Sequence, residues 1–326
     1  MRAVRQLTAM IVCLGLFAGC SSTPNDAAPS GNADPGFAPA TIATKFGDVT
    51  ISSRPTKVVA LGWGDAETAL AMGIQPIAAS DWVQFGGAGV GPWATGKYSR
   101  PPKIIGTLDP NYEEIASLRP DLILDVKGSG DEGRHSKLAA IAPTIGIPQG
   151  ADNYKTTQEQ QVDMVARALG TPDKGQRLLT DLNAKIAGIK AAHPNWQGRT
   201  VSAIARSSGG WGAYVPGAFR LDLLLRLGFV PNPKITALAN KANNFSVVLS
   251  EEQLGLADAD AIIGYPVGVQ PSAITDSLQW RTIPAVAQGR SVIVNPDYSK
   301  AYALGSILST GYALDRFVPE LEKASH

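Results

Sequence analysis

The sequence is poor in cysteine and histidine. It contains 2 Cys, Cys13 and Cys20, and 3 His among its 326 residues. A zinc or manganese site needs about three or four well-spaced His, Cys or carboxylate ligands. The widely separated His135, His193 and His326 do not supply them. A protein that binds a bare divalent metal ion is therefore not expected.

The sequence also lacks an excess of charge of either sign. Lys and Arg total 29 and Asp and Glu total 28, which gives a formal net charge of +1. Such a balance provides no broad electrostatic attraction to nucleic acid. Hydrophobic residues make up 44% of the chain and charged residues 17%, as is typical of a folded globular protein.

Apolar runs long enough for a permanent membrane span, roughly 20 residues, are missing. The apolar run at 7–17 is shorter, follows Arg2 and Arg5, and ends just before Gly-Cys. Small residues directly before a single Cys resemble a bacterial lipobox. This pattern predicts a lipoprotein signal peptide at 1–20 with Cys20 as the acylated residue. The alternative is an ordinary secretory signal with an incidental Cys.

Cleavage of such a signal would leave a chain without a disulfide. Cys13 would be removed, and the sulfur of Cys20 would carry lipid. Residues 21–40 are rich in Ser, Pro, Gly, Asn, Asp and Ala, a composition that buries too little apolar surface to fold. They are predicted to form a flexible tether.

Residues 41–155 alternate short apolar runs with helix-like segments. Strands are expected at 48–51, 57–61, 77–79, 120–125 and 143–145, and helices at 65–72, 112–118 and 137–141. Short strands that alternate with helices predict an α/β lobe with a mainly parallel sheet.

The segment at 156–196 has a different pattern. It predicts a helix at 157–169 and a long amphipathic helix at 175–192, closed by Pro194. The alternation then resumes at 197–326, with strands expected at 201–205, 260–264 and 292–294 and helices at 221–227, 251–256 and 303–321. The pattern predicts two α/β lobes joined by a helical segment.

Several blocks around the long helix resemble one family. They are RPTKVVAL (54–61), ALAMGIQPI (69–77), NYEEIASLRPDLI (111–123), LSEEQL (249–254), ADADAII (257–263) and IPAVAQGR (283–290). Their order and spacing are similar to those of the ABC-importer binding proteins for iron-siderophores, haem and cobalamin. The resemblance implies two Rossmann-like α/β lobes joined by one long α-helix, with a ligand cleft between the lobes. It also implies a binding protein rather than an enzyme.

The same resemblance implies a partner permease in the membrane. By motif match, Glu113 and Glu252 are the residues that would dock into Arg pockets of the permease, with Glu114 and Glu251 beside them in the chain. An exposed carboxylate is normally just solvated, which is the alternative, and its ion pairs are worth only about 0–1 kcal/mol. Two carboxylates at a fixed separation can nevertheless set the register and the rate of association.

Ligand-binding residues are expected at the carboxyl ends of strands, where open α/β sheets bind ligands. The candidates are aromatic and arginine side chains in or near these loops: Trp63, Trp82, Trp93, Tyr98, Arg134, Arg206, Trp211, Tyr214 and Tyr298. Rigid aromatic side chains suit a flat, partly apolar ligand. Arginine suits a carboxylate or an anionic metal chelate. The alternative is that the aromatic side chains pack on the core.

The scarcity of residues that could coordinate iron narrows the class of molecule that the protein is expected to bind. Haem iron can be held by Tyr or His, and the candidates are Tyr98, Tyr214, Tyr298 and His135. A siderophore supplies its own iron ligands, so a ferric siderophore is favoured, with haem or cobalamin as the alternative. No cofactor is expected, since the iron would arrive already chelated. The resemblance further suggests a monomer. The lipobox-like pattern at Cys20 predicts a lipid anchor at the outer face of the cytoplasmic membrane.

Two motifs that could indicate an enzyme are discounted. GSGDEG at 128–133 fits G-x-G-x-x-G, but its two carboxylates would repel a pyrophosphate. GPWATGKY at 91–98 nearly matches a P-loop, but Tyr98 replaces the Ser or Thr that holds Mg²⁺. An extracellular α/β enzyme would need a nucleophile and base or a metal in the cleft, and no G-x-S-x-G elbow is present.

Overall fold

The computed structural model describes residues 36–239 and 245–324. The predicted signal peptide at 1–20, its lipidation residue Cys20 and most of the predicted tether at 21–40 lie outside these ranges. Within the two described ranges, no helix combines the length and the apolar character needed to cross a membrane.

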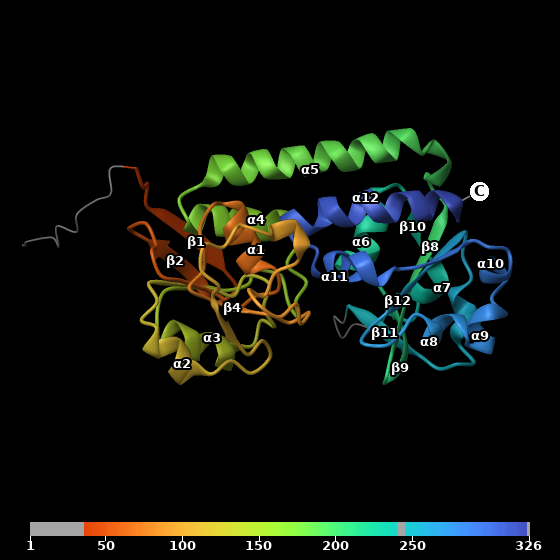
Figure 1. Ribbon diagram of the computed structural model, residues 1–326, viewed down its shortest axis with the longest axis horizontal. Coiled ribbons are helices and arrows are strands. Elements are labelled where there is room, and N and C mark those ends of the chain that lie inside the picture. Colours follow the sequence, from red (N-terminus) through yellow and green to blue (C-terminus); the bar gives the residue numbers. More distant parts are fainter. Residues whose placement is uncertain (1–35, 240–244, 325–326) are drawn as a thin grey trace, which may run out of the picture. The chain divides into compact units, whose positions relative to one another are not determined.

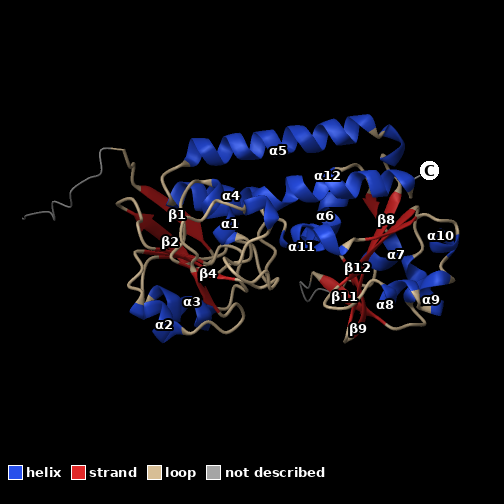
Figure 2. Ribbon diagram, in the orientation of Figure 1, coloured by secondary structure: helices blue, strands red, loops and turns tan. Residues whose placement is uncertain are grey.

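Figures 1 and 2 show two groups of strands, each accompanied by helices. The first of the two larger sheets is parallel throughout. Its strands in spatial order are β5 (Lys103–Ile105), β4 (Ala78–Ser80), β3 (Val58–Ala60), β6 (Leu122–Leu124) and β7 (Thr144–Ile145). The three central strands are buried at every residue, as in parallel sheets that are covered on both faces. The accompanying helices are α1 (Asp65–Ala71), η1 (Pro92–Ala94), α2 (Tyr112–Ser117) and α3 (Glu132–Ala139). We call this part the N-terminal lobe.

The second sheet is mixed and organises the C-terminal lobe. Its strands in spatial order are β11 (Ser246–Leu249), β9 (Gly210–Tyr214), β8 (Thr200–Ser207), β12 (Ala261–Pro266) and β13 (Ser291–Ile293), with β10 (Val230–Pro231) paired to β8. Strands β8, β12 and β13 run parallel, whereas β9 and β11 are antiparallel to their neighbours. The helices are α6 (Phe219–Arg226), α7 (Pro233–Thr236), η3 (Leu254–Ala257), α8 (Ser272–Thr275), α9 (Leu278–Arg281), α10 (Pro284–Ala287), α11 (Pro296–Leu304) and α12 (Ile307–Lys323).

A hairpin and a helical segment complete the fold. The hairpin consists of β1 (Ala40–Thr44) and β2 (Gly47–Ile51). Between the sheets lie α4 (Gln158–Ala168), α5 (Pro172–Ala192) and the short η2 (Pro194–Trp196). The 21-residue α5 buries a stripe formed by Leu179, Leu182 and Ile186 and lies beside α4 and α12 (Figure 1). The predicted fold class, two α/β lobes joined by a long helix, is confirmed.

Three local predictions are wrong. The helix expected at 303–321 is two helices, because Gly305 ends α11 in the left-handed conformation (φ 59°) and Ser306 caps α12. The strand expected to end at 205 continues to Ser207 and turns directly into a tight β8–β9 hairpin. The helix expected at 137–141 begins earlier, at Glu132, because the Asp131 side chain accepts from the Arg134 backbone N–H and starts α3.

Both lobes share one hydrophobic cluster. It includes Val58 and Leu124 of the first sheet, Val162 of α4, and Leu224 and Phe317 of the C-terminal lobe. Further buried residues in this cluster come from α1, α5 and α12. The lobes are therefore joined by packed side chains as well as by the covalent connection.

Two glycines provide a matched test of this packing. A Cβ at Gly305 would lie 2.4 Å from the Phe219 ring, and its φ of +59° is unfavourable for other residues. Gly305→Ala should lower the free energy of unfolding by at least about 1–2 kcal/mol. Gly188→Ala, at an exposed site of α5 where a Cβ meets nothing within 4 Å, should raise it by about 0.5–1 kcal/mol. Urea unfolding of both variants measures these changes, and equal effects would contradict the strained junction.

Candidate ligand-binding site

A cleft of about 520 Å³ lies at the carboxyl ends of β4 and β12. The N-terminal lobe contributes residues 82–84, directly after β4. The C-terminal lobe contributes Arg220 of α6, residues 265–271 and the side chains of α11, including Lys300. Ligands of open α/β sheets bind outside the carboxyl ends of strands, so this cleft is the candidate site.

Three aromatic rings are stacked beside the cleft on the N-terminal lobe. The Trp63 ring lies 4.1 Å from the Trp82 ring and 3.9 Å from the Tyr154 ring, with interplanar angles of 12° and 13°. Trp82 lines the cleft. The indole N–H groups of Trp63 and Trp82 are buried without a hydrogen-bond partner in the described parts of the chain. The stack presents a rigid aromatic surface, of the kind that packs against a partly apolar ligand.

The glycine-rich segment at 128–133 positions the third ring. The backbone N–H groups of Asn153 and Tyr154 donate to the carbonyls of Ser129 and Gly128 at 3.0 Å. A Cβ at Gly128 would lie 2.7 Å from the Asp125 carboxylate, so the turn requires glycine there. Tyr154 itself has a φ of +62°. The motif that resembles a dinucleotide-binding loop therefore holds the aromatic stack in place.

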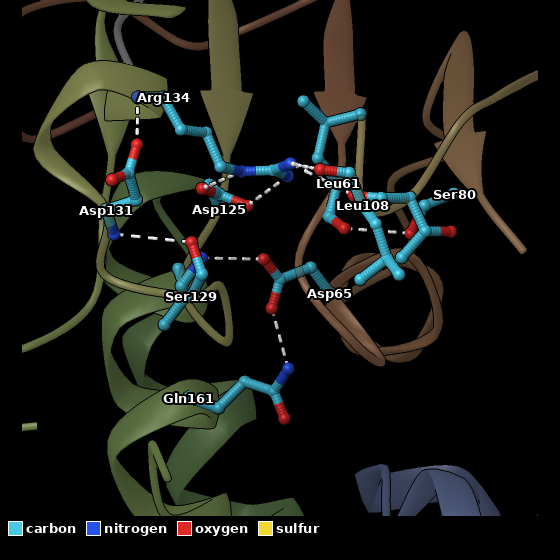
Figure 3. Close-up of polar contacts among 11 residues, drawn as sticks. Leu61, Asp65, Ser80, Leu108, Asp125, Ser129, Asp131, Arg134 and Gln161 are labelled. Carbon is cyan, nitrogen blue, oxygen red and sulfur yellow. Dashed lines mark hydrogen bonds and ion pairs between the residues drawn. The ribbon is translucent and has the colours of Figure 1, made fainter. Parts of the chain in front are cut away.

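A buried ion pair joins Asp125, which follows β6, to Arg134 of α3 (Figure 3). Arg134 donates from Nε and Nη2 to the two carboxylate oxygens of Asp125, both at 2.9 Å. Its Nη1 donates to the carbonyl of Thr107 at 2.9 Å. Burial raises the pKa of Asp125, and the hydrogen bonds from Arg134 oppose that rise. The pair fixes the end of β6 to α3 and to the loop after β5.

A second buried carboxylate fixes the neighbouring loops. Asp65 accepts from the Val126 backbone N–H at 2.8 Å and from Gln161 Nε2 at 2.6 Å (Figure 3). Gln161 also donates to the Trp63 carbonyl at 2.9 Å. Burial raises the pKa of Asp65 to about 7 against these hydrogen bonds. Burial also lowers the pKa of the nearby Lys127 to about 8, and the negative charge of Asp65 opposes this fall.

A third buried carboxylate joins the two lobes. Glu67 Oε2, in α1, accepts hydrogen bonds from Trp93 Nε1 at 2.8 Å and from the hydroxyl of Ser306 at the start of α12. Burial raises the pKa of Glu67 to about 7, and the donors from Ser306 and Trp93 oppose the rise. The junction of the lobes therefore contains a carboxyl group that is protonated on the acid side of neutrality.

The predicted ligand residues of the N-terminal lobe are distributed over four places. Trp63 and Trp82 lie together in the aromatic stack, and Trp82 lines the cleft. Trp93 contacts Phe85 and Tyr312 at the lobe junction, and Tyr98 lines a separate pocket of about 450 Å³ formed by residues in the range 85–101. Arg134 is buried in its ion pair with Asp125.

The predicted ligand residues of the C-terminal lobe lie mostly in the core. Trp211 is a buried β9 residue stacked on Trp280. Tyr214 is buried, and the buried Tyr298 donates its hydroxyl to Glu320. Arg206 lies at the end of β8 opposite Pro266, which lines the cleft, and its guanidinium lies 5.1 Å from the Trp211 ring. None of these four lines the cleft, and their roles in ligand binding stay predictions.

Sequence reasoning missed Tyr154, Arg220 and Lys300. Tyr154 follows Pro-Gln-Gly-Ala-Asp-Asn at 148–153, a stretch of turn-forming residues that predicts a loop but not which side chain the loop presents. Arg220 lies in the first turn of α6, shortly after the turn-forming Pro-Gly at 216–217. Lys300 belongs to α11, whose start is predicted by Asn-Pro-Asp at 295–297. Those two signals are visible in the sequence and could have placed both cations near strand ends.

The two predicted docking carboxylates are both exposed. Glu113 lies in the first turn of α2 and Glu252 in the turn after β11. Their neighbours differ, since Glu114 forms an ion pair with Lys103 at 2.6 Å whereas Glu251 is exposed. In the described residues, no group of three or more His, Cys, Asp or Glu side chains is placed to hold a metal ion.

Comparison with known proteins places this architecture in a family. A sequence profile described as "Periplasmic binding protein" matches residues 58–298. The chain belongs to the periplasmic binding protein family. The predicted family resemblance is thereby confirmed, and so is the prediction that the chain is a binding protein rather than an enzyme.

Individual members show the same relationship over most of the chain. The "Probable siderophore-binding lipoprotein YfiY" of Bacillus subtilis is 27% identical over 285 residues, which cover 81% of this chain and 82% of that protein. The "Putative ABC transporter substrate-binding lipoprotein YhfQ" of the same organism is 27% identical, with 79% and 77% covered. The crystal structure of a periplasmic solute binding protein from Mycobacterium smegmatis has a TM-score of 0.77 at 26% identity and covers 88% of this chain and 99% of its own.

The protonation of Glu67 predicts how stability depends on pH. The folded state keeps the proton up to a pKa of about 7, whereas the unfolded chain releases it near 4.5. The folded state therefore binds more protons between these values, and its contribution to the free energy of unfolding falls as the pH rises. Glu67→Gln should reduce this fall by on the order of 1–3 kcal/mol.

Urea unfolding of both proteins between pH 4.5 and 7.5 measures the difference. The control is Glu132→Gln at an exposed position of α3, which should leave the pH dependence as it is. A Glu67→Gln profile parallel to that of the parent chain would contradict the burial of a protonated Glu67.

Proposed function

We propose that this member of the periplasmic binding protein family captures a ferric siderophore in its cleft and delivers it to an ABC permease. The observation that carries the proposal is the cleft itself, which has an aromatic wall at Trp82 and cationic side chains from the other lobe. A siderophore brings its own iron ligands, so the protein needs only a complementary surface. The similarity to a protein described as a probable siderophore-binding lipoprotein supports the same ligand class.

The mechanism needs four steps. The chelate enters the cleft and packs against Trp82, and the lobes tilt to enclose it. The shared hydrophobic cluster and α5 limit this motion, because opening widely would expose packed side chains. The closed protein then docks through Glu113 and Glu252, which project from different lobes. Release follows when the permease separates the lobes.

Haem, the alternative ligand, lacks a supporting observation. Its iron would need a Tyr or His ligand, and the four candidates lie away from the cleft lining. Tyr298 and Tyr214 are buried in the C-terminal lobe, His135 is stacked on Phe46 at 3.9 Å, and Tyr98 lines the other pocket. A cobalamin carrier is likewise favoured by no contact in the described residues.

The cellular setting is part of the proposal. Lipid on Cys20 would anchor the protein to the outer face of the cytoplasmic membrane, as in relatives that are described as lipoproteins. The domain boundaries that we propose are 41–155 for the N-terminal lobe, 156–196 for the connecting segment and 197–326 for the C-terminal lobe. We further propose that the protein acts as a monomer.

Binding should depend on the aromatic wall. Trp82→Ala removes the ring that lines the cleft and should weaken binding of a ferric siderophore by about tenfold or more, since aromatic contacts dominate many binding sites. Trp82→Phe keeps a ring and should lose less. Isothermal titration calorimetry measures both. Equal affinities in all three proteins would place the ligand elsewhere.

Docking should depend on the two exposed carboxylates without affecting the ligand. Glu113→Ala and Glu252→Ala should reduce uptake of radioactive iron into cells by several-fold, because they remove contacts to the permease. Their affinity for the ferric siderophore should stay unchanged. Glu251→Ala is the matched control next in the chain. Uptake that falls equally in the control would contradict the assignment of Glu252.

A further inference from the structure

The charged side chains that line the cleft are of one sign. The described residues that line it include Arg220 and Lys300 and no Asp or Glu. Arg206 lies at the neighbouring strand end, opposite Pro266 of the lining. None of these three cations forms an ion pair with a carboxylate within the described ranges.

Two of the three carboxylates nearest in the chain to these lining segments are engaged elsewhere, and the third, Asp297 in the first turn of α11, is exposed and does not line the cleft. Asp81 accepts from the backbone N–H groups of Phe85 and Gly86 at 2.9 and 2.8 Å, which closes the turn that carries Gln84. Asp222, two residues after Arg220, accepts from the Gly217 backbone N–H at 3.0 Å and interacts with Lys127. Both negative charges are therefore partly satisfied by contacts outside the lining.

Lys300 is held at the mouth of the cleft by groups that do not neutralise it. Its ammonium donates to the Gln84 carbonyl of the other lobe at 2.6 Å and lies 5.3 Å from the Phe85 ring. Gln84, whose carbonyl accepts this hydrogen bond, is in the left-handed backbone conformation with a φ of +55°. A carbonyl and a ring orient the ammonium and leave its full positive charge available.

Arg220 is also held in place by neutral groups. Its carbonyl accepts from the hydroxyls of Tyr265 and Tyr302 at 3.3 and 3.2 Å, and its guanidinium lies 5.0 Å from the Tyr214 ring. The guanidinium has paired donors that match a carboxylate or another pair of oxygens. The structure thus keeps two uncompensated cations in a concave site, where charges interact more strongly than in water.

We propose that the cleft selects ferric chelates of net negative charge, held by Arg220 and Lys300, over neutral ones. The inference rests on the proposed function and adds the charge class of the ligand. An anionic chelate neutralises both cations as it packs against Trp82. A neutral chelate covers them without neutralising them and must bear the cost of removing their water.

The test compares chelates of different charge on the full chain. The probes are ferric citrate and a ferric tris-catecholate, both anionic, and a neutral ferric trihydroxamate, with calorimetry at 50 and 500 mM NaCl. We expect at least one anionic chelate to bind about tenfold or more tighter than the neutral one at low salt. Its affinity should fall several-fold at high salt, because salt screens the charges. The two anionic probes distinguish carboxylate from catecholate oxygens as the recognised groups.

Variants assign the selectivity to the two cations. Lys300→Gln and Arg220→Gln should each weaken binding of the anionic chelate by about tenfold and of the neutral chelate by less than about twofold. Lys300→Arg keeps the charge and should restore most of the affinity. The control Lys190→Gln, at an exposed position of α5, makes the same change in net charge away from the cleft and should have no effect.

The outcomes separate this inference from the proposed function. Tight binding of the neutral chelate, with anionic chelates no tighter, overturns charge selection and leaves siderophore capture standing. A preference for anions that survives both Gln substitutions overturns the assignment to Arg220 and Lys300. Failure of every ferric chelate to bind overturns the proposed function and the inference together.

Discussion

The candidate site depends on charged groups buried behind the ends of the parallel strands. The Asp125–Arg134 pair and Asp65 bind backbone groups of the loops after β5 and β6. Gln161, which donates to Asp65, also donates to the Trp63 carbonyl in the loop after β3. Removing one partner of such a pair leaves an uncompensated buried charge, at a cost of about 3–5 kcal/mol. These loops carry Trp63 and hold the turn at Tyr154. The position of the aromatic stack therefore depends on these buried charged groups. Buried polar contacts outside the cleft thus hold in place the aromatic surface that we propose contacts the ligand.

The two lobes are joined by more than the long helix. Ser306 at the start of α12 donates to Glu67 of the N-terminal lobe, and Lys300 of α11 donates to the Gln84 carbonyl. The first contact is buried within the shared core, whereas the second lies at the cleft. An anionic ligand that binds Lys300 therefore competes with a hydrogen bond between the lobes. This arrangement gives a physical link between the occupancy of the cleft and the relative position of the surfaces that carry Glu113 and Glu252.

The sequence was sufficient for the architecture and less so for the site. The alternation of apolar runs and the stripe on α5 predict both lobes and their connection, because burial imposes those periods directly. Trp63 and Trp82 could be placed near each other because parallel strands end at one edge. Trp211 could not be assigned to the core, since Gly-Gly before it also fits a loop. The break at Gly305 has a local signal, because Gly followed by Ser favours a helix end and a new helix cap. Local turns also place Arg220 and Lys300 near strand ends, but their meeting in one cleft depends on contacts between segments distant in the sequence, which local patterns do not encode.

The central claim is that the cleft between residues 82–84 and the C-terminal lobe holds the iron chelate. The most direct measurement is a crystal structure of the full chain grown with an anionic ferric chelate, with the iron located by its anomalous scattering. The account predicts an iron peak within the cleft lined by Trp82, Arg220 and Lys300, with chelate oxygens facing the two cations. An iron peak in the pocket at 85–101, or at a site outside both pockets, would contradict it.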